Sequence, residues 1–393
     1  MAGLSRRGRG FEPLSAHVTT MRDLLRAAPL IDGHNDLLYE LRLRRIATGE
    51  ELDVAEACPE LMTDVPRLQA GGLGGQFWSV FVPSDLPGHE AVTQTLEQID
   101  AFHDLLARHP DRFEQARTAD DVERIAGAGR IASMIGVEGG HAIGGSLGAL
   151  RMLARLGASY LTLTHNDDTA WADSATGDHP HGGLTTFGEE VVRELNRLGV
   201  LVDLSHVSDD TMRQAIEVSA APVIFSHSSA RALCDVPRDV PDDVLELVAR
   251  TDGVVMVTFV PAFVAPEGAE AMAEAWDEAV RVRAAHPDDH EAVHAAMDAW
   301  FRAHPGPVAT IGQVADHIDH VREVAGVAAV GIGSDFDGAN SMPQGLTDVG
   351  CYPSLFEELA ARGYADDELT AIAGRNVLRV MRAAEAVAQG SGV

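Results

Sequence analysis

The stretch VLVDLSHVSDDTMRQAIEVSAAPVIFSH (residues 200–227) contains two short, mostly apolar runs separated by a helical pattern. The runs at 200–205 and 222–226 predict buried parallel strands, and the residues at 209–219 predict the helix that joins them. Each run leads through a serine into a histidine, His206 or His227. Because neighbouring parallel strands end at the same edge of a sheet, we expect both imidazoles to face one site.

The same strand-and-helix unit recurs along most of the chain. Apolar runs predict eight strands, at 29–33, 76–82, 131–137, 159–164, 200–205, 222–226, 253–259 and 327–334. Helical patterns follow them, at 91–108, 119–127, 147–157, 186–198, 209–219, 241–251, 312–325, 354–361 and 367–386. Eight such units favour a closed (β/α)8 TIM barrel, an α/β fold, over an open sheet.

Two stretches depart from the regular spacing. Residues 37–74 contain an expected helix at 40–47, and the glycine-rich run at 71–75 predicts a turn because no helix follows it. Residues 260–311, after the seventh strand, hold two further helical segments. We expect a single catalytic domain over residues 1–393. An insertion of that size on the catalytic face can act as a lid or as the contact of a homodimer, with plain decoration as the alternative.

The composition excludes several classes of function. The formal net charge of −30 argues against nucleic acid and anionic membranes as partners. All 30 basic residues are arginine. The chain therefore has no lysine to form a Schiff base, to bind phosphate in a P-loop or to bridge two metal ions.

The cysteines and the termini bear on the compartment. Cys58, Cys234 and Cys351 are too widely spaced for a metal motif or a disulfide framework, which fits a reducing environment. Residues 1–27 contain no apolar core of signal-peptide length, and no run approaches the ~18 apolar residues of a membrane span. We therefore expect a cytoplasmic protein without membrane attachment.

Further candidate residues also stand at strand ends. His34 and Asp36, two apart on a strand, face the same side and can reach one metal ion. Glu138 ends an apolar run, and its two oxygens allow it to bridge two cations. His165 can be a ligand or an electrophile that polarises a carbonyl. Asp335 can take a proton from metal-bound water and return it to a leaving amine.

Other histidines fit no site. His317 and His320 match the pattern of a solvated helix face.

Six motifs, in order along the chain, closely resemble the membrane (renal) dipeptidase family of zinc metallopeptidases. They are His-Asn-Asp at 34–36, Glu-Gly-Gly-His at 138–141, Leu-Thr-His-Asn at 163–166, Asp-Leu-Ser-His at 203–206, Phe-Ser-His-Ser-Ser at 225–229 and Ser-Asp-Phe-Asp-Gly at 334–338. The resemblance implies a barrel that binds two zinc ions. His34 and Asp36 would hold one ion, His206 and His227 the other, and Glu138 would bridge them.

The resemblance also implies how substrate is bound. His165 would contact it near the scissile carbonyl, Arg238 would bind its C-terminal carboxylate, and Asp335 would be the catalytic aspartate. Members of the family cleave dipeptides and often accept a D-residue at the second position. A small dipeptide is therefore the expected substrate. Arg231, the other basic residue before the next helix, is the weaker candidate for the carboxylate contact.

Two alternatives remain at this stage. Other amidohydrolase-type hydrolases, such as deaminases and phosphotriesterases, usually show His-x-His on the first strand, and the dinuclear ones often use a bridging lysine. This chain has His-x-Asp and no lysine. A non-catalytic metal-binding protein on the same fold is the second alternative. The presence of Asp335 and Arg238 beside a full ligand set counts against it.

Overall fold

The computed structural model describes residues 21, 24–25, 28–286, 290–304 and 309–390. The strands are β1 (Leu30–Asn35), β2 (Leu73–Phe81), β3 (Phe113–Gln115), β4 (Ile131–Glu138), β5 (Ala158–Thr162), β6 (Leu201–Asp203), β7 (Ile224–Phe225), β8 (Val254–Val257) and β9 (Val330–Ile332). The helices around them are α2 (Leu37–Thr48), α3 (Val65–Gly71), α4 (Gly88–Arg108), α5 (Ala119–Gly127), α6 (Leu147–Leu156), α7 (Thr186–Leu198), α8 (Asp209–Val218), α9 (Asp242–Arg250), α10 (Pro261–Val264), α11 (Pro266–Ala285), α12 (His290–Ala303), α13 (Ile311–Ala325), α14 (Tyr352–Ala361), α15 (Asp366–Thr370) and α16 (Asn376–Gly390).

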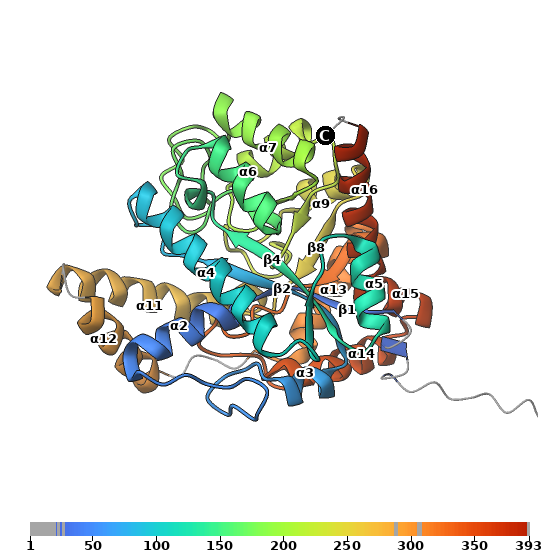
Figure 1. Cartoon of the computed structure of the whole chain (residues 1–393), viewed down its shortest axis with the longest axis horizontal. Coiled ribbons are helices and arrows are strands. Elements are labelled where there is room, and N and C mark those ends of the chain that lie inside the picture. Colours follow the sequence, from blue (N-terminus) through green and yellow to red (C-terminus); the bar gives the residue numbers. More distant parts are fainter. Residues whose placement is uncertain (1–20, 22–23, 26–27, 287–289, 305–308, 391–393) are drawn as a thin grey trace, which may run out of the picture.

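The strands form a closed parallel barrel with helices around it (Figure 1). The sheet order is β2-β1-β9-β8-β7-β6-β5-β4-β3, and a pairing between β2 and β4 closes the ring. The predicted (β/α)8 barrel is therefore confirmed. β3 is a ninth, additional strand. It pairs with residues 131–133 at the start of β4, whereas β5 pairs with residues 135–137 of the same strand. It was not predicted, because three residues give no periodic signal.

Local sequence explains why individual helices begin and end where they do. α7 begins after Thr185, whose side chain accepts a hydrogen bond from the Gly188 N–H, and it ends at Gly199 in the left-handed conformation. Its buried face includes Val191, Val192 and Leu195, which gives the spacing of an amphipathic helix on a core. The predicted range 186–198 is confirmed.

Two expectations about local structure were wrong in part. β2 begins at Leu73, so Gly74 and Gly75 belong to a strand and not to a turn. A Cβ on Gly74 would lie 2.9 Å from the Cβ of Pro29, so glycine allows close packing against the start of β1. The closing helix expected at 367–386 is interrupted by a π-helical turn (Ala371–Arg375), where a Cβ on Gly374 would overlap the Pro29 carbonyl oxygen.

Residues 260–311 contain the two predicted helices, α11 and α12, preceded by the short α10. Figure 1 shows α11 and α12 extending to one side of the barrel. α11 buries Gly268, Ala275 and Val282. Among the described residues, no helix combines the length and the apolar character needed to cross a membrane.

Candidate metal centre

The barrel brings the predicted site residues to the carboxyl ends of its strands. His34 lies in β1, Glu138 is the last residue of β4, and His165, His206, His227 and Asp335 follow β5, β6, β7 and β9. Three overlapping groups have ligand atoms within 4.8 Å of one another: His34 with Glu138 and His227, Glu138 with His165 and His206, and His34 with Asp36 and Asp335. Side chains that are distant in sequence thus form one cluster, and all of its members except His165 and Asp335 are buried.

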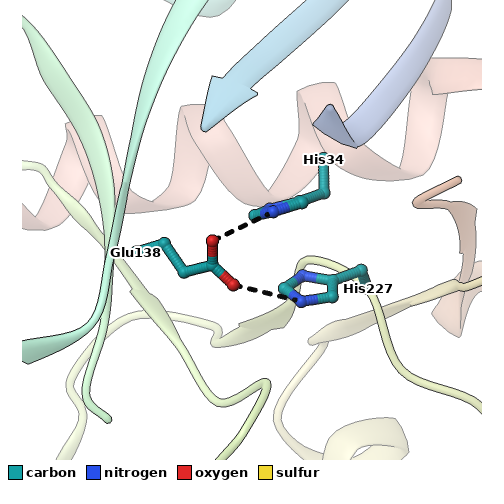
Figure 2. Close-up of side chains that lie close together, drawn as sticks. All are labelled: His34, Glu138 and His227. Atoms are coloured by element: carbon teal, nitrogen blue, oxygen red, sulfur yellow. Dashed lines mark ion pairs between the residues drawn. The ribbon is translucent and has the colours of Figure 1, made fainter. Parts of the chain in front are cut away.

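Glu138 stands at the middle of this cluster, and its two oxygens face different partners (Figure 2). Oε2 lies 3.3 Å from Nε2 of His34 and accepts a hydrogen bond of 3.0 Å from the Ser79 hydroxyl. Oε1 lies 3.1 Å from Nε2 of His206 and 3.5 Å from Nε2 of His227. Each oxygen of this carboxylate therefore faces a different set of side chains. Oε2 faces the first group, which is His34 with Asp36 and Asp335, and Oε1 faces the second group, which is His206 with His227.

The first group contains two more carboxylates. Oδ2 of Asp36 lies 3.2 Å from Nε2 of His34. A carboxylate oxygen of Asp335 lies within 4.8 Å of the ligand atoms of both residues. A Cβ on Gly338 would overlap carboxylate oxygens of Asp36 and Asp335, so the backbone there lies directly against both groups. Only glycine leaves room for this approach.

Two of these residues have unusual backbone conformations. His206 has φ 69° and Asp335 has φ 66°, in the left-handed region that few residues other than glycine adopt. Hydrogen bonds hold both positions: the His206 carbonyl accepts from the Ala175 N–H at 2.7 Å, and the Asp335 N–H donates to the His34 carbonyl at 3.2 Å. Strained backbone of this kind clusters at functional sites, where surrounding structure maintains it.

The His34 ring is oriented by a tyrosine. Its Nδ1 lies 2.8 Å from the Tyr160 hydroxyl, which donates its own hydrogen to the Gly33 carbonyl at 3.3 Å. Nδ1 is therefore the protonated donor, and Nε2 faces Asp36 and Glu138 without another partner among the described residues. Burial opposes protonation of His34, but Tyr160, Glu138 and Asp36 outweigh it and raise the pKa well above its ordinary value. A positive charge, from a proton or a metal cation, is favoured at Nε2.

A similar chain orients His227. Its Nδ1 lies 2.8 Å from the Ser226 hydroxyl, and that hydroxyl donates to Oδ2 of Asp203 at 2.6 Å. Nδ1 must then carry the hydrogen, which leaves Nε2 facing Glu138 and, at 3.0 Å, Nε2 of His206. Histidine ligands of metal ions are commonly fixed through the other ring nitrogen in this way.

Sequence reasoning missed these supporting residues. Tyr160 and Asp203 are polar side chains inside otherwise apolar strand runs, and both are fully buried. A buried aspartate in a strand is a signal that could have been noticed. Its partner could not have been named, because it depends on which strand lies beside it in the barrel.

His165 lies at the edge of the cluster. Its Nε2 is 3.7 Å from Oε1 of Glu138, and its ring packs against Phe81 and His206 with centroid distances of 4.7 and 4.3 Å. Burial lowers the pKa of His165 to about 4, against the opposing effect of Glu138. The ring is therefore neutral at physiological pH, a form in which one nitrogen can donate a hydrogen bond and the other is free to bind a metal ion.

Arg238 is buried next to the second group, whereas Arg231 is engaged elsewhere. The Arg238 guanidinium donates to the Ser228 hydroxyl at 2.7 Å and to the His227 carbonyl at 2.8 Å. Its Nε finds no hydrogen-bond acceptor among the described residues. Arg231 instead forms a two-bond pair with Asp209, with both distances 2.7 Å.

The comparisons with known proteins identify the family of this chain. Residues 18–392 match the family described as membrane dipeptidase (peptidase family M19). An uncharacterised dipeptidase from Schizosaccharomyces pombe is 43% identical over 371 residues, which cover 91% of this chain and 81% of that protein.

Solved structures share the fold. The probable dipeptidase PvdM from Pseudomonas aeruginosa gives a TM-score of 0.80 at 24% identity and covers 93% of this chain and 98% of its own. A metallopeptidase from Rhodobacter sphaeroides, liganded with a phosphinate mimic of the dipeptide L-Ala-D-Ala, gives 0.74 at 25% identity and covers 91% and 99%. The family predicted from the six motifs is confirmed: the chain belongs to the membrane dipeptidase family, peptidase family M19, and is a metal-dependent dipeptidase.

Proposed function

We propose that this chain binds two divalent cations bridged by Glu138 and hydrolyses dipeptides, including those whose second residue has the D configuration. The observation that carries the proposal is the placement of the two Glu138 oxygens, each within 3.3 Å of a histidine from a different group. A carboxylate that serves only one ion has no need of such an arrangement.

The ligand set fits two cations. His34 and Asp36 would hold one, His206 and His227 the other, and Glu138 both. These nitrogen and oxygen donors suit zinc. Cations among these groups would compensate the buried carboxylates. When bound, the pair would lower the pKa of a shared water toward neutrality and polarise the scissile carbonyl.

Asp335 is the proposed proton carrier. Burial raises the pKa of Asp335 well above its usual range, and the neighbouring carboxylates of Asp36 and Glu138 raise it further against the effect of His34. The geometry supports the role, because Asp335 lies within 4.8 Å of the ligand atoms of His34 and Asp36, where a carboxylate can accept a proton from water and release it. Asp335 accepts the proton of the attacking water and passes it to the departing amine.

His165 and Arg238 are proposed to bind the substrate. The neutral His165 ring donates a hydrogen bond to the carbonyl under attack. Arg238 uses two of its five N–H donors on Ser228 and His227, so donors remain for the terminal carboxylate of a dipeptide. A fixed cation at that end would restrict substrates to two residues.

We also propose that the whole chain is one catalytic domain and that the insertion contributes to it. Phe263 of α10 packs its ring 5.3 Å from the Arg238 guanidinium, so the insertion forms one wall beside the carboxylate contact. Its two expected roles, lid and dimer contact, stay predictions. The three cysteines are unpaired in the described chain, which favours a reducing compartment such as the cytoplasm.

A substrate screen tests the proposed function. The zinc-loaded protein should cleave both L-Ala-L-Ala and L-Ala-D-Ala, and removal of metal by a chelator should abolish both activities. The second substrate is chosen because a mimic of it is bound in the Rhodobacter sphaeroides metallopeptidase. If no dipeptide in a broad screen is cleaved, the proposal is wrong; if only L,L-dipeptides are cleaved, the extension to D-residues is wrong.

A further inference from the structure

His317, which the proposed chemistry does not use, is buried among functional segments. The sequence pattern placed it on a solvated face of α13, but its exposed fraction is 1%. This expectation was wrong, because the helix turns this side chain inward. Its two ring nitrogens bind the backbone of two other segments.

The two bonds fix the state of the ring. Nδ1 of His317 lies 3.0 Å from the backbone N–H of Ala230, which can only donate, so Nδ1 must be an unprotonated acceptor. Nε2 then carries the single hydrogen and donates it to the Val264 carbonyl at 3.2 Å. A doubly protonated ring would direct an N–H at the Ala230 N–H. Burial also lowers the pKa of His317 to about 4.

On the Nδ1 side is the loop that carries Arg238. Ser229 donates its N–H to Asp239 at 3.1 Å and accepts the Val240 N–H at 2.8 Å. These bonds fold the loop back on itself between Ala230 and Val240. The fold returns Arg238 to the Ser228 hydroxyl and the His227 carbonyl, at the edge of the metal centre.

On the Nε2 side is the helix that begins the insertion. Val264 is the last residue of α10, next to Phe263, whose ring lies 5.3 Å from the Arg238 guanidinium. A second, weaker link joins the same two segments, because Cys234 Sγ lies 3.5 Å from the Ala262 carbonyl. His317 is thus hydrogen-bonded to both walls beside Arg238.

We propose that His317 is a positioning residue that sets the distance between α10 and the Arg238 loop and so shapes the pocket for the substrate's terminal carboxylate. The proposal rests on the function proposed above. It assigns to a residue of α13 an effect on substrate binding, although that residue is neither a proposed metal ligand nor a proposed substrate contact.

Steady-state kinetics of the zinc-loaded enzyme test it. The substrates are a cleaved dipeptide and its C-terminal amide, and the variants are His317→Leu, which removes both bonds, and His317→Asn, which is too short to span both backbone groups. We expect KM for the free dipeptide to rise about 10-fold or more, with kcat within about twofold, since small misplacements of binding groups have effects of this size. Turnover of the amide should change less than twofold.

Two further variants sharpen the result. His317→Gln offers one acceptor and one donor and should restore KM, whereas a merely space-filling role would not distinguish Gln from Leu. His320→Leu is the matched control on the same helix, because His320 pairs with Asp242 at the surface; it should leave both substrates unaffected. Zinc content and circular dichroism establish that each variant is folded and loaded.

The outcomes separate this inference from the proposed function. If the wild type distinguishes the dipeptide from its amide and the folded His317→Leu and His317→Asn variants keep that discrimination, the positioning role is wrong. It is equally wrong if both substrates lose activity to the same degree. If the wild type itself does not distinguish the two substrates, the carboxylate contact fails and this inference fails with it. Should His317→Leu not fold, His317→Asn supplies the expected loss, and His317→Gln the expected rescue.

Discussion

Asp335 occupies a left-handed backbone position from which its carboxylate meets Asp36 and His34. If it carries the proton between water and the leaving amine, Asp335→Asn should reduce kcat by about 10²-fold or more, the usual scale for a positioned acid–base group. The amide is almost the same size, so zinc content should not change. Kinetics and metal analysis on one preparation test both statements, and near-normal turnover in the fully loaded variant would remove Asp335 from the mechanism.

Arg238 should bind the terminal carboxylate of the substrate. Amidating the C-terminus of a dipeptide should therefore lower kcat/KM as much as Arg238→Ala does. The two losses in kcat/KM should not add, because each change removes the same ion pair. Arg238→Lys should restore activity only in part, since an ammonium group lacks the planar fork of donors. Arg238 also holds the His227 carbonyl, so zinc content must be measured alongside kcat/KM. Equal cleavage of free and amidated dipeptides would rule out this contact.

At the scale of single residues, sequence predicts which side chains meet but not what orients them. His34, Glu138, His206 and His227 could be named because each stands at or near a strand's carboxyl end, where parallel strands converge. The hydrogen bond between Tyr160 and His34 could not be predicted, because it joins β5 to β1 across the barrel. Its existence depends on strand register, which the pattern of apolar residues leaves open.

Among the structural elements, the ends of β1, β7 and β9 depend on glycines. A Cβ on either Gly33 or Gly333 would overlap the Ser226 carbonyl oxygen, one residue before His227. We expect Gly333→Ala to lower the free energy of unfolding by about 1–3 kcal/mol, the usual cost of overpacking, and to weaken zinc binding through His227. Urea unfolding and zinc titration measure the two effects.

Gly127 provides the control for that substitution. It lies in α5, and a Cβ there would meet nothing within 4 Å. Gly127→Ala should be neutral or stabilise by up to about 1 kcal/mol, because alanine favours a helix. Equal effects at both positions would contradict the packing argument.

His317, which lies in α13, should make the free energy of unfolding depend on pH. Burial lowers the pKa of His317 to about 4 from an ordinary 6.5; the hydrogen bond to Val264 and the charge of Asp316 oppose this shift, and His320 adds to it. The unfolded chain therefore takes up a proton below pH 6.5 that the folded chain refuses until about pH 4, so stability falls as pH falls through that window. Between pH 7 and pH 5 the loss should be about 2 kcal/mol.

His317→Gln removes this titration while keeping both backbone bonds within reach. Urea unfolding at the two pH values should show a pH-dependent loss that is about 2 kcal/mol smaller in the variant than in the wild type. Other groups, including the metal ligands, titrate in both proteins and cancel in the comparison. If the free energy of unfolding depends on pH in the same way in the wild type and in His317→Gln, the fold does not hold the His317 ring neutral.

Regular elements were predicted best where the sequence has both a periodic face and a cap. α5 and α7 match their expected ranges at both ends, and each begins after a threonine whose side chain caps the helix. The π-helical turn at 371–375 was not foreseen, because it arises from contact with Pro29 at the start of β1 and not from local sequence.

For the whole molecule, the count of strand-and-helix units predicted a barrel, but the pairing that closes it could be seen only in the structure. β2 and β4 pair from Gly75 with Ala132 to Phe81 with Glu138. This contact brings Glu138 beside the end of β2, where Ser79 donates a hydrogen bond to it. The pairing that closes the barrel therefore also sets the position of Glu138.

The metal content of the purified protein tests the account most directly. Two divalent ions per chain are predicted at full activity, because Glu138 directs one oxygen to each group of ligands. Glu138→Gln should weaken the binding of both ions, whereas His227→Ala should weaken mainly one. Zinc titration followed by elemental analysis, with activity measured on the same samples, gives the stoichiometry. Two equivalents at maximal activity is the predicted result, and full activity with a single tightly bound ion would contradict it.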